Sequence, residues 1–228
     1  MVELLHLIFI APLETALLWV LRSAYALTGS YGAAIILLSL AFNILLLPFY
    51  YYAETVQNRE RAVQKRLAPK VEEFRAVFTG QERYMMLRTL YRQNGYHPVY
   101  ALRSLLPLAM QVPFFIATFG LLSSFAPLNG QPFLLFADLG RPDGLLGGVN
   151  LMPFVMTAAN LASGLVYTRS LTRRDRTQTW IVAGIFLVLL YGSPVGLVLY
   201  WTVSNLFSLA KNCVYAQLGR RPRMEFAQ

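Results

Sequence analysis

The segment Thr177–Ala210 reads TQTWIVAGIFLVLLYGSPVGLVLYWTVSNLFSLA and contains no Asp, Glu, Lys or Arg in 34 residues. As one α-helix it would extend about 51 Å at 1.5 Å per residue, well beyond a hydrocarbon core of about 30 Å. Near its middle, Gly192-Ser193-Pro194 interrupts a helix, because proline lacks the backbone donor and clashes with the preceding turn. The segment therefore predicts two membrane-spanning helices joined by a tight turn, at about 177–191 and 194–217.

Long uncharged stretches occur three more times in the 228-residue chain, at Ser23–Ala53, Ser104–Ala137 and Gly144–Thr168. The chain is 56% hydrophobic and only 14% charged, with a formal net charge of +9, so intrinsic disorder is excluded. Its single Cys213 excludes a disulfide scaffold within one chain. We expect an all-α integral membrane protein with five transmembrane helices, the remaining three at about 31–52, 98–125 and 149–167.

The basic residues predict the orientation of these spans. Ten of the 20 lie between Arg59 and Arg103, four between Arg169 and Arg176, and four between Lys211 and Arg223. Five spans place all three segments on one side, which the positive-inside rule makes the cytoplasm. We therefore expect an outside N-terminus, a basic cytoplasmic tail at 218–228 and the plasma (inner) membrane of a bacterium.

Residues 1–30 are expected to form an amphipathic helix on the outer face. After Pro12, apolar residues recur at helical spacing, at Leu13, Leu17, Val20, Leu21 and Ala24. The start Met1-Val2-Glu3 lacks a basic region, so no cleaved signal peptide is expected. The alternative is an additional span over Leu4–Leu21, which would bring the N-terminus inside.

The segment 54–97 predicts a cytoplasmic helical hairpin. Its apolar positions recur at helical intervals and are interrupted at Thr79-Gly80, where a second, shorter stripe begins. Basic residues are interleaved with acidic ones, among them Glu54 and Glu60. This pattern is typical of a solvated face with i,i+4 pairs, and it also suits contact with anionic lipid or ribosomal RNA.

The polar residues of the spans are neutral. No carboxylate or lysine lies well inside a span, which argues against ion-coupled transport. His6 and His97 fall in different compartments, and no His-Glu-x-x-His or Gly-x-Ser-x-Gly motif occurs, so no catalytic or metal site is expected. Both helix packing and one hydrated cavity would explain the neutral set, which comprises Ser39, Asn43, Gln111, Thr157, Asn160, Ser163, Thr202, Ser204 and Asn205.

Five short motifs are specific enough to indicate a protein family. They are, in order, Asn43-Ile-Leu-Leu-Leu-Pro48, Leu67-Ala-Pro69-Lys-Val, Tyr91-Arg-Gln-Asn-Gly-Tyr-His97-Pro98, Leu106-Pro107-Leu-Ala-Met-Gln111-Val-Pro113-Phe-Phe and Pro194-Val-Gly196-Leu-Val-Leu-Tyr200-Trp201-Thr-Val-Ser204-Asn205-Leu. In this order they resemble the YidC/Oxa/Alb family of membrane-protein insertases, over about Pro12 to Gln217. The short N-terminus resembles the compact bacterial members.

The resemblance implies an insertase and chaperone that works without nucleotide hydrolysis and without a cofactor, through a hydrophilic groove open to the cytoplasm and to lipid. Nascent membrane proteins and the lipid bilayer are the implied partners; the ribosome and the Sec translocon are further candidates, and DNA is not expected. The implied groove residues are Asn43, Gln111, Thr157, Asn160, Ser163, Tyr200, Trp201 and Asn205. The implied receiving surface of the hairpin comprises Arg59, Arg61, Lys65, Arg66, Pro69, Lys70 and Arg75.

One departure from the family pattern concerns Asn43, because most members carry an arginine at that groove position. Asparagine keeps the hydrogen-bonding capacity but has no charge with which to attract acidic substrate tails. The alternative functions are a small multi-span transporter or channel, for which the broken helix at Gly192–Pro194 is the best feature, and a membrane-embedded scaffold.

Overall fold

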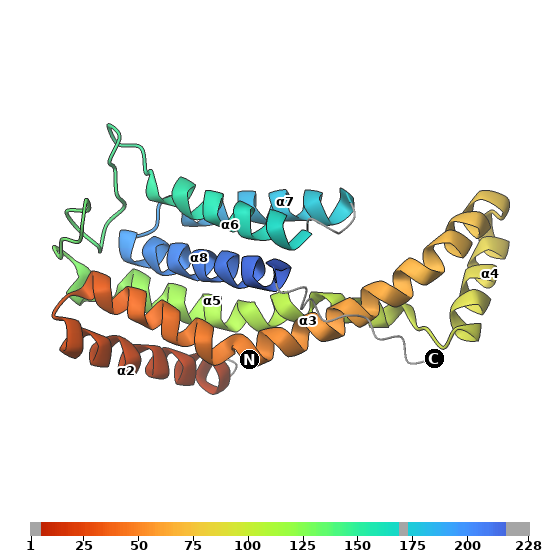
Figure 1. Cartoon of the computed structure of the whole chain (residues 1–228), viewed down its shortest axis with the longest axis horizontal. Helices are drawn as coiled ribbons and strands as arrows, with labels where there is room; N and C mark the ends of the chain where they lie inside the picture. Colours follow the sequence, from red (N-terminus) through yellow and green to blue (C-terminus); the bar gives the residue numbers. More distant parts are fainter. Residues whose placement is uncertain (1–5, 169–172, 218–228) are drawn as a thin grey trace. The chain divides into compact units, whose positions relative to one another are not determined.

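The computed structural model describes residues 6–168 and 173–217, and within these ranges the regular structure is helical apart from two isolated β-bridges. The expected tail at 218–228 and the first five residues lie outside the described residues. The α-helices are α2 (Ala11–Thr28), α3 (Tyr31–Val77), α4 (Gly80–Gln93), α5 (Leu106–Ser124), α6 (Met152–Thr168), α7 (Arg173–Leu190) and α8 (Val195–Gln217) (Figure 1). A π-helical turn, His6–Ile10, precedes α2, and 3₁₀ turns occupy Pro98–Leu105 and Ala126–Leu128.

The chain divides into two compact units. The first, here called the bundle unit, contains the described residues up to Leu46 and from Pro113 onward. The second, the hairpin unit, contains Leu47–Val112. Each unit has its own buried residues and is described separately below.

Helix α8 lies at the centre of the bundle unit, with α6 and α7 on one side and α3 and α5 on the other (Figure 1). The Trp201 ring contacts Phe115 of α5 and Phe186 of α7, with ring centroids 5.1 and 5.8 Å apart. On another side, Ser39 of α3 donates a hydrogen bond to the Tyr200 carbonyl at 3.1 Å. Every residue from Val195 to Thr202 is buried, so the first half of α8 forms the middle of the apolar core.

The 125–151 loop closes the beginning of α8. The backbone N–H of Val195 donates to the Arg141 carbonyl at 2.9 Å, and the N–H of Gly196 donates to the Leu139 carbonyl at 2.8 Å. These bonds satisfy donors that a helix N-terminus leaves without intrahelical partners. The close approach favours glycine at 196, because a Cβ there would lie 3.1 Å from a methyl carbon of Leu128, and the neighbours would have to shift.

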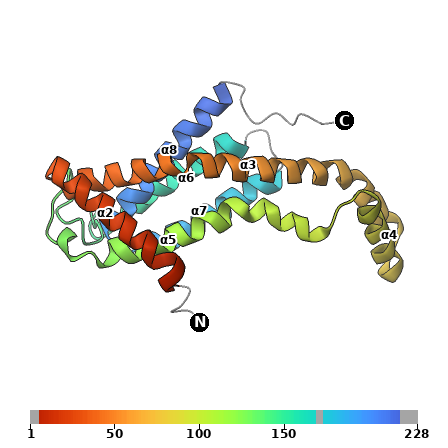
Figure 2. The same cartoon turned by 90° about the horizontal axis from the view of Figure 1, so that it is seen from below.

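Helix α2 packs on the bundle unit through the stripe of apolar residues that the sequence predicts. Leu17, Leu21 and Ala24 are buried in the core. The helix ends at Gly29, whose φ of 67° supplies the left-handed C-cap. Farther back, α2 crosses α5, where the Glu14 carboxylate occupies the space that a side chain at Gly120 would need (Figure 2).

The hairpin unit contains the second part of α3, which stays helical through Pro69 to Val77, and α4, which returns from Gly80. The break predicted at Thr79-Gly80 lies between the two helices, where Gly80 has a φ of 54°. Leu67 and Leu90 are both buried in this unit. Apolar residues from α3 and α4 therefore form a small core of the hairpin's own.

Only α3 is, among the described residues, long and apolar enough to cross a membrane by itself. Its most apolar 18-residue window has a mean hydropathy of 2.3. Three shorter apolar helical stretches occur at Gln111–Ser124, Met152–Tyr167 and Thr177–Leu190. The arrangement is an all-helical protein with one clear spanning helix, and the count of five spans stays a prediction.

Candidate functional site

The second half of α8 carries polar residues at helical spacing. Ser204, Ser208 and Asn212 are four residues apart and follow one side of the helix, and Asn205 is about 100° around the helix from Ser204. Their partners come from α3 and α6 of the bundle unit. We call this set the polar seam; its members are Ser39, Asn43, Asn160, Ser163, Ser204, Asn205, Ser208 and Asn212.

On the α3 side, the seam is organised by Asn43. Its amide nitrogen donates to the Ser204 hydroxyl at 3.0 Å and to the Ser39 carbonyl, one turn earlier, at 2.8 Å. The hydroxyls of Ser39 and Ser204 are 2.9 Å apart. Asn43 is only 8% exposed, so this amide is held between two helices and also bonds the backbone of its own helix.

On the α6 side, the seam continues for two further turns. The Asn160 amide donates to the Asn205 side-chain carbonyl at 2.9 Å. One turn on, the hydroxyls of Ser163 and Ser208 are 3.1 Å apart, and Asn212 donates to the Ser163 hydroxyl, also at 3.1 Å. The hydrogen bonds therefore follow α8 along its second half.

The seam has a defined chemistry, because all of its side chains are neutral hydroxyls and carboxamides. Such groups both donate and accept hydrogen bonds. Each can therefore replace its partner in the seam by a water molecule or by a polar group of another chain. None of them titrates near neutral pH. Within the described part of the chain, no three His, Cys, Asp or Glu side chains are grouped closely enough to share a metal ion.

The predicted groove residues fall into different environments. Asn43 lies on one side of α8, and Asn160, Ser163 and Asn205 lie on another. Thr157 bonds the Pro153 carbonyl of its own helix at 2.7 Å. One cavity shared by the whole predicted set stays a prediction.

Besides Thr157, three predicted groove residues are not members of the polar seam. Tyr200 and Trp201 are buried in the apolar half of α8. The indole N–H of Trp201 has no hydrogen-bond partner among the described residues, and it lies one turn before Ser204. Gln111, half-buried on α5, belongs to the hairpin unit. Trp201 thus offers an unused donor at the edge of the seam.

Sequence reasoning did not select Ser208 and Asn212, and it named Ser39 and Ser204 as polar without placing them in the site. A signal for the first two was present, because they continue the spacing of Ser204 at intervals of four.

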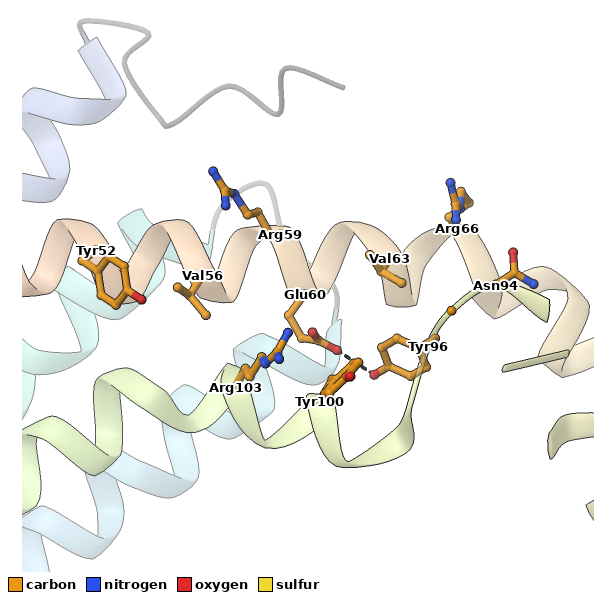
Figure 3. Close-up of a pocket in the computed structure, with 11 residues that line it drawn as sticks. Tyr52, Val56, Arg59, Glu60, Val63, Arg66, Asn94, Tyr96, Tyr100 and Arg103 are labelled. Atoms are coloured by element: carbon orange, nitrogen blue, oxygen red, sulfur yellow. Dashed lines mark hydrogen bonds between the residues drawn. The ribbon is translucent and has the colours of Figure 1, made fainter. Parts of the chain in front are cut away.

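The hairpin unit contains a cavity of about 520 Å³ between α3 and the segment 94–103 (Figure 3). Glu60 of α3 faces it and is only 6% exposed, so the expectation of a solvated face is wrong at this residue. Its carboxylate oxygen Oε1 accepts a hydrogen bond from the Tyr96 hydroxyl at 2.6 Å. Loss of hydration and the bond to Glu60 raise the pKa of Tyr96 to about 12.

The predicted receiving residues of the hairpin are mostly exposed along α3. Arg59 and Arg66 border the cavity, but their side chains rise from the side of α3 opposite to Tyr96 (Figure 3). Arg61 is half-buried. The other exposed members are Lys65, Pro69, Lys70 and Arg75.

Comparison with known proteins assigns the family. The model of the 60Kd inner membrane protein family matches residues 23–221 of the chain. The chain belongs to this family. It is the family of the YidC insertases, whose curated members match at low identity over most of this chain. A membrane protein insertase YidC from Treponema denticola is 26% identical over 225 residues, covering 90% of this chain and 38% of that protein.

Two further YidC insertases match with similar identity and coverage. The Polynucleobacter asymbioticus protein is 28% identical, covering 94% of this chain and 37% of that protein. The Syntrophobacter fumaroxidans protein is 30% identical, covering 86% and 36% respectively. The chain thus spans little more than a third of the length of the curated relatives it matches.

The fold agrees with the family. A crystal structure of an active YidC insertase, with its first transmembrane domain resolved, matches with a TM-score of 0.56 and 25% sequence identity. The match covers 87% of this chain and 45% of that chain. The helical arrangement described above is therefore that of a YidC-type protein.

Proposed function

We propose that this chain inserts membrane proteins and helps them fold; its relatives are membrane protein insertases by name, which supports the first part of the proposal. The observation that carries the proposal is the polar seam, a set of neutral hydrogen-bonding side chains that joins α8 to α3 on one side and to α6 on another. No covalent chemistry is required for this activity, and we expect none.

The proposal includes the membrane arrangement. Five spans, at about 31–52, 98–125, 149–167, 177–191 and 194–217, place the N-terminus outside and the C-terminus in the cytoplasm of a bacterial cell. The basic asymmetry supports this orientation, since 18 of 20 basic residues then lie on the cytoplasmic side. The 125–151 loop is then outside, and the polar half of α8 lies toward the cytoplasm.

In the proposed mechanism, a hydrophilic segment of the substrate enters beside the polar seam. Seam hydroxyls and carboxamides replace part of the water that the segment loses, which reduces the cost of taking polar groups into a low-dielectric region. The substrate's apolar segment meanwhile moves into lipid, and its burial supplies the driving force at about 25 cal/mol per Å². The buried apolar half of α8 closes the path toward the outer side.

The test is reconstitution into liposomes with a freshly synthesised single-span substrate. We expect protease-protected substrate in the absence of ATP, and loss of protection when seam residues are replaced. A transporter or channel would conduct solute through the same liposomes but leave the substrate accessible to protease. That result would reject the insertase proposal.

The uncharged Asn43 predicts a substrate preference. Without a guanidinium in the seam, acidic outer tails gain no Coulomb attraction there, so Asn43→Arg should improve acidic-tailed substrates selectively. The competing source of charge is Arg103, in which case Arg103→Gln would cause a selective loss for acidic tails. Insertion of an acidic and a neutral tail by both variants separates the two accounts.

The exposed basic residues of the hairpin are proposed to receive the substrate or its carrier, and the ribosome and the Sec translocon are the candidate carriers. Replacing Glu60–Arg88 by a short Gly/Ser bridge should reduce insertion while the spans remain folded. Full insertion by this deletion variant would remove the receiving role.

A further inference from the structure

The cavity of the hairpin unit is separate from the polar seam, and the proposed mechanism does not use it. Its volume of about 520 Å³ lies within the range of about 300–1,000 Å³ that is typical of small-ligand pockets. Helix α3 forms one side and the segment 94–103 the other (Figure 3). The chemistry of the lining indicates what kind of group fits.

A buried carboxylate is the first feature of the lining. Glu60 is 6% exposed, and both hydrogen bonds that it accepts, from the Tyr96 hydroxyl at 2.6 Å and from the Gln64 amide at 3.4 Å, go to Oε1. Among the residues that the structure describes, Oε2 has no hydrogen-bond donor and Glu60 has no ion pair. Oε2 therefore has lone pairs open to a cation that enters the cavity.

A guanidinium is the second feature. Arg103 lies on the wall opposite α3, with its Cζ 4.0 Å from the centroid of the Tyr100 ring. In Figure 3 its side chain extends toward Glu60, whereas those of Arg59 and Arg66 extend away on the far side of α3. Stacking on Tyr100 holds the guanidinium in place but leaves its N–H groups at the edge available to an anion.

Glu60 and Arg103 therefore place an anionic and a cationic group inside a cavity that is also lined by tyrosines and valines, with two further arginines at its border. This pattern complements a small zwitterion that has an ammonium and a phosphate a few atoms apart. We infer that the cavity binds the headgroup of an ethanolamine phospholipid. The ammonium donates to Glu60 Oε2, and the phosphate accepts from Arg103, while the glycerol end contacts Tyr52 and Val56.

The position of the cavity along α3 fits a lipid, and this step rests on the proposed membrane arrangement. Glu60 lies eight residues beyond Tyr52, where the first proposed span ends, or about 12 Å along the helix. Helical side chains lean toward the helix N-terminus, which here brings the carboxylate several ångströms back toward the membrane. A headgroup whose acyl chains remain in the bilayer can then reach it.

The experiment measures lipid binding to the full chain in detergent by native mass spectrometry, with no substrate present. Phosphatidylethanolamine, phosphatidylcholine and phosphatidylglycerol with identical acyl chains are the probes. We expect one retained phosphatidylethanolamine with an affinity about tenfold above the other two lipids, the size of one charge-assisted hydrogen bond. Phosphatidylcholine tests whether binding requires N–H donors on the headgroup, because its quaternary ammonium has none.

Two charge variants assign the groups. Glu60→Gln keeps an acceptor for the Tyr96 hydroxyl but should abolish the preference for the ethanolamine lipid. Arg103→Gln should weaken the binding of all three lipids equally. Glu73→Gln and Arg92→Gln, at exposed positions of the same unit, are the matched controls and should change nothing. Val63→Phe should fill the cavity and prevent lipid retention without altering a charge.

Equal retention of the three lipids by the unaltered chain would overturn the inference, and so would a preference that survives Glu60→Gln. If Glu60→Gln lowers insertion but leaves the ethanolamine preference unchanged, the cavity receives polypeptide instead. Because binding is measured without substrate, a failure of the insertase proposal would not by itself remove the ethanolamine preference.

Discussion

The two halves of α8 are held in opposite ways. From Val195 to Thr202 every residue is buried, and the loop carbonyls of Leu139 and Arg141 fix the start of the helix. From Ser204 to Asn212 the same helix is held by hydrogen bonds between neutral side chains. Close-packed apolar contacts cannot exchange partners, whereas hydroxyls and carboxamides can bond water or a passing chain equally well. One helix therefore combines a fixed half with a half that can be wetted.

The largest effect should come from a cavity in the fixed half. Leu197 is fully buried, so Leu197→Ala should lower the free energy of unfolding by about 2–5 kcal/mol. Leu206→Ala, in the other half, removes a side chain that is 50% exposed and should cost less than about 1 kcal/mol. Unfolding in mixed micelles measures both; equal losses would mean that the halves do not differ.

Asn43→Leu should separate function from stability. The Ser204 hydroxyl keeps its Ser39 partner, so the fold should survive with a loss of about 1 kcal/mol. The substrate loses a polar contact, and we expect insertion in liposomes to fall roughly fivefold. Ile44→Ala, at an exposed neighbouring position, is the control. Insertion at the full rate by Asn43→Leu would show that the amide serves packing alone.

A smaller effect tests whether the second half of α8 is held loosely. In a double-mutant cycle with Asn160→Ala and Asn205→Ala, the coupling energy should be about 0.6 kcal/mol, as is usual for hydrogen bonds between membrane helices. Thermal unfolding of the two single variants and the double variant gives this energy. A coupling energy above about 2 kcal/mol would show that this hydrogen bond holds α6 and α8 together firmly.

The smallest effect concerns pH, since the seam has no titrating group, whereas the hairpin unit contains Tyr96, whose pKa is raised. The pKa of Tyr96 is raised to about 12, so its protonated form is favoured in the folded state. Stability from this group should be complete below pH of about 10 and should decline as the pH rises through about 12. Phenolate absorbance should show this late transition, and Tyr96→Phe should remove it.

The effect of Asn43→Leu on unfolding, by contrast, should be the same throughout this pH range. Glu60→Gln should move the Tyr96 transition back toward the ordinary tyrosine value, because it removes the neighbouring negative charge. An unchanged transition in this variant would show that Glu60 does not influence the phenol.

Local breaks in the helices could be predicted because single residues determine them. Gly80, with its positive φ, separates α3 from α4. Gly192-Ser193-Pro194 separates α7, which ends at Leu190, from α8, which begins at Val195. The change in composition was a weaker guide to where a helix ends. Charged residues begin at Glu54, but α3 continues to Val77.

The partners within the seam could not be predicted, because they depend on the register between helices. Asn160 and Asn205 are 45 residues apart, and a shift of either helix by one residue would separate them. Glu60, however, carried a readable signal. It lies four residues after Val56 and three before Val63, on the apolar stripe of α3, where a carboxylate is unlikely to be solvated.

The central position of α8 has a consequence for how the protein is made. Of the described helices it is the last to leave the ribosome, yet α3, α5, α6 and α7 all contact it. During synthesis these earlier helices must remain side by side around an incomplete interior, with the loop carbonyls that will receive Val195 and Gly196 already made. Among the described helices, the core around α8 is therefore completed only after its neighbours have been synthesised.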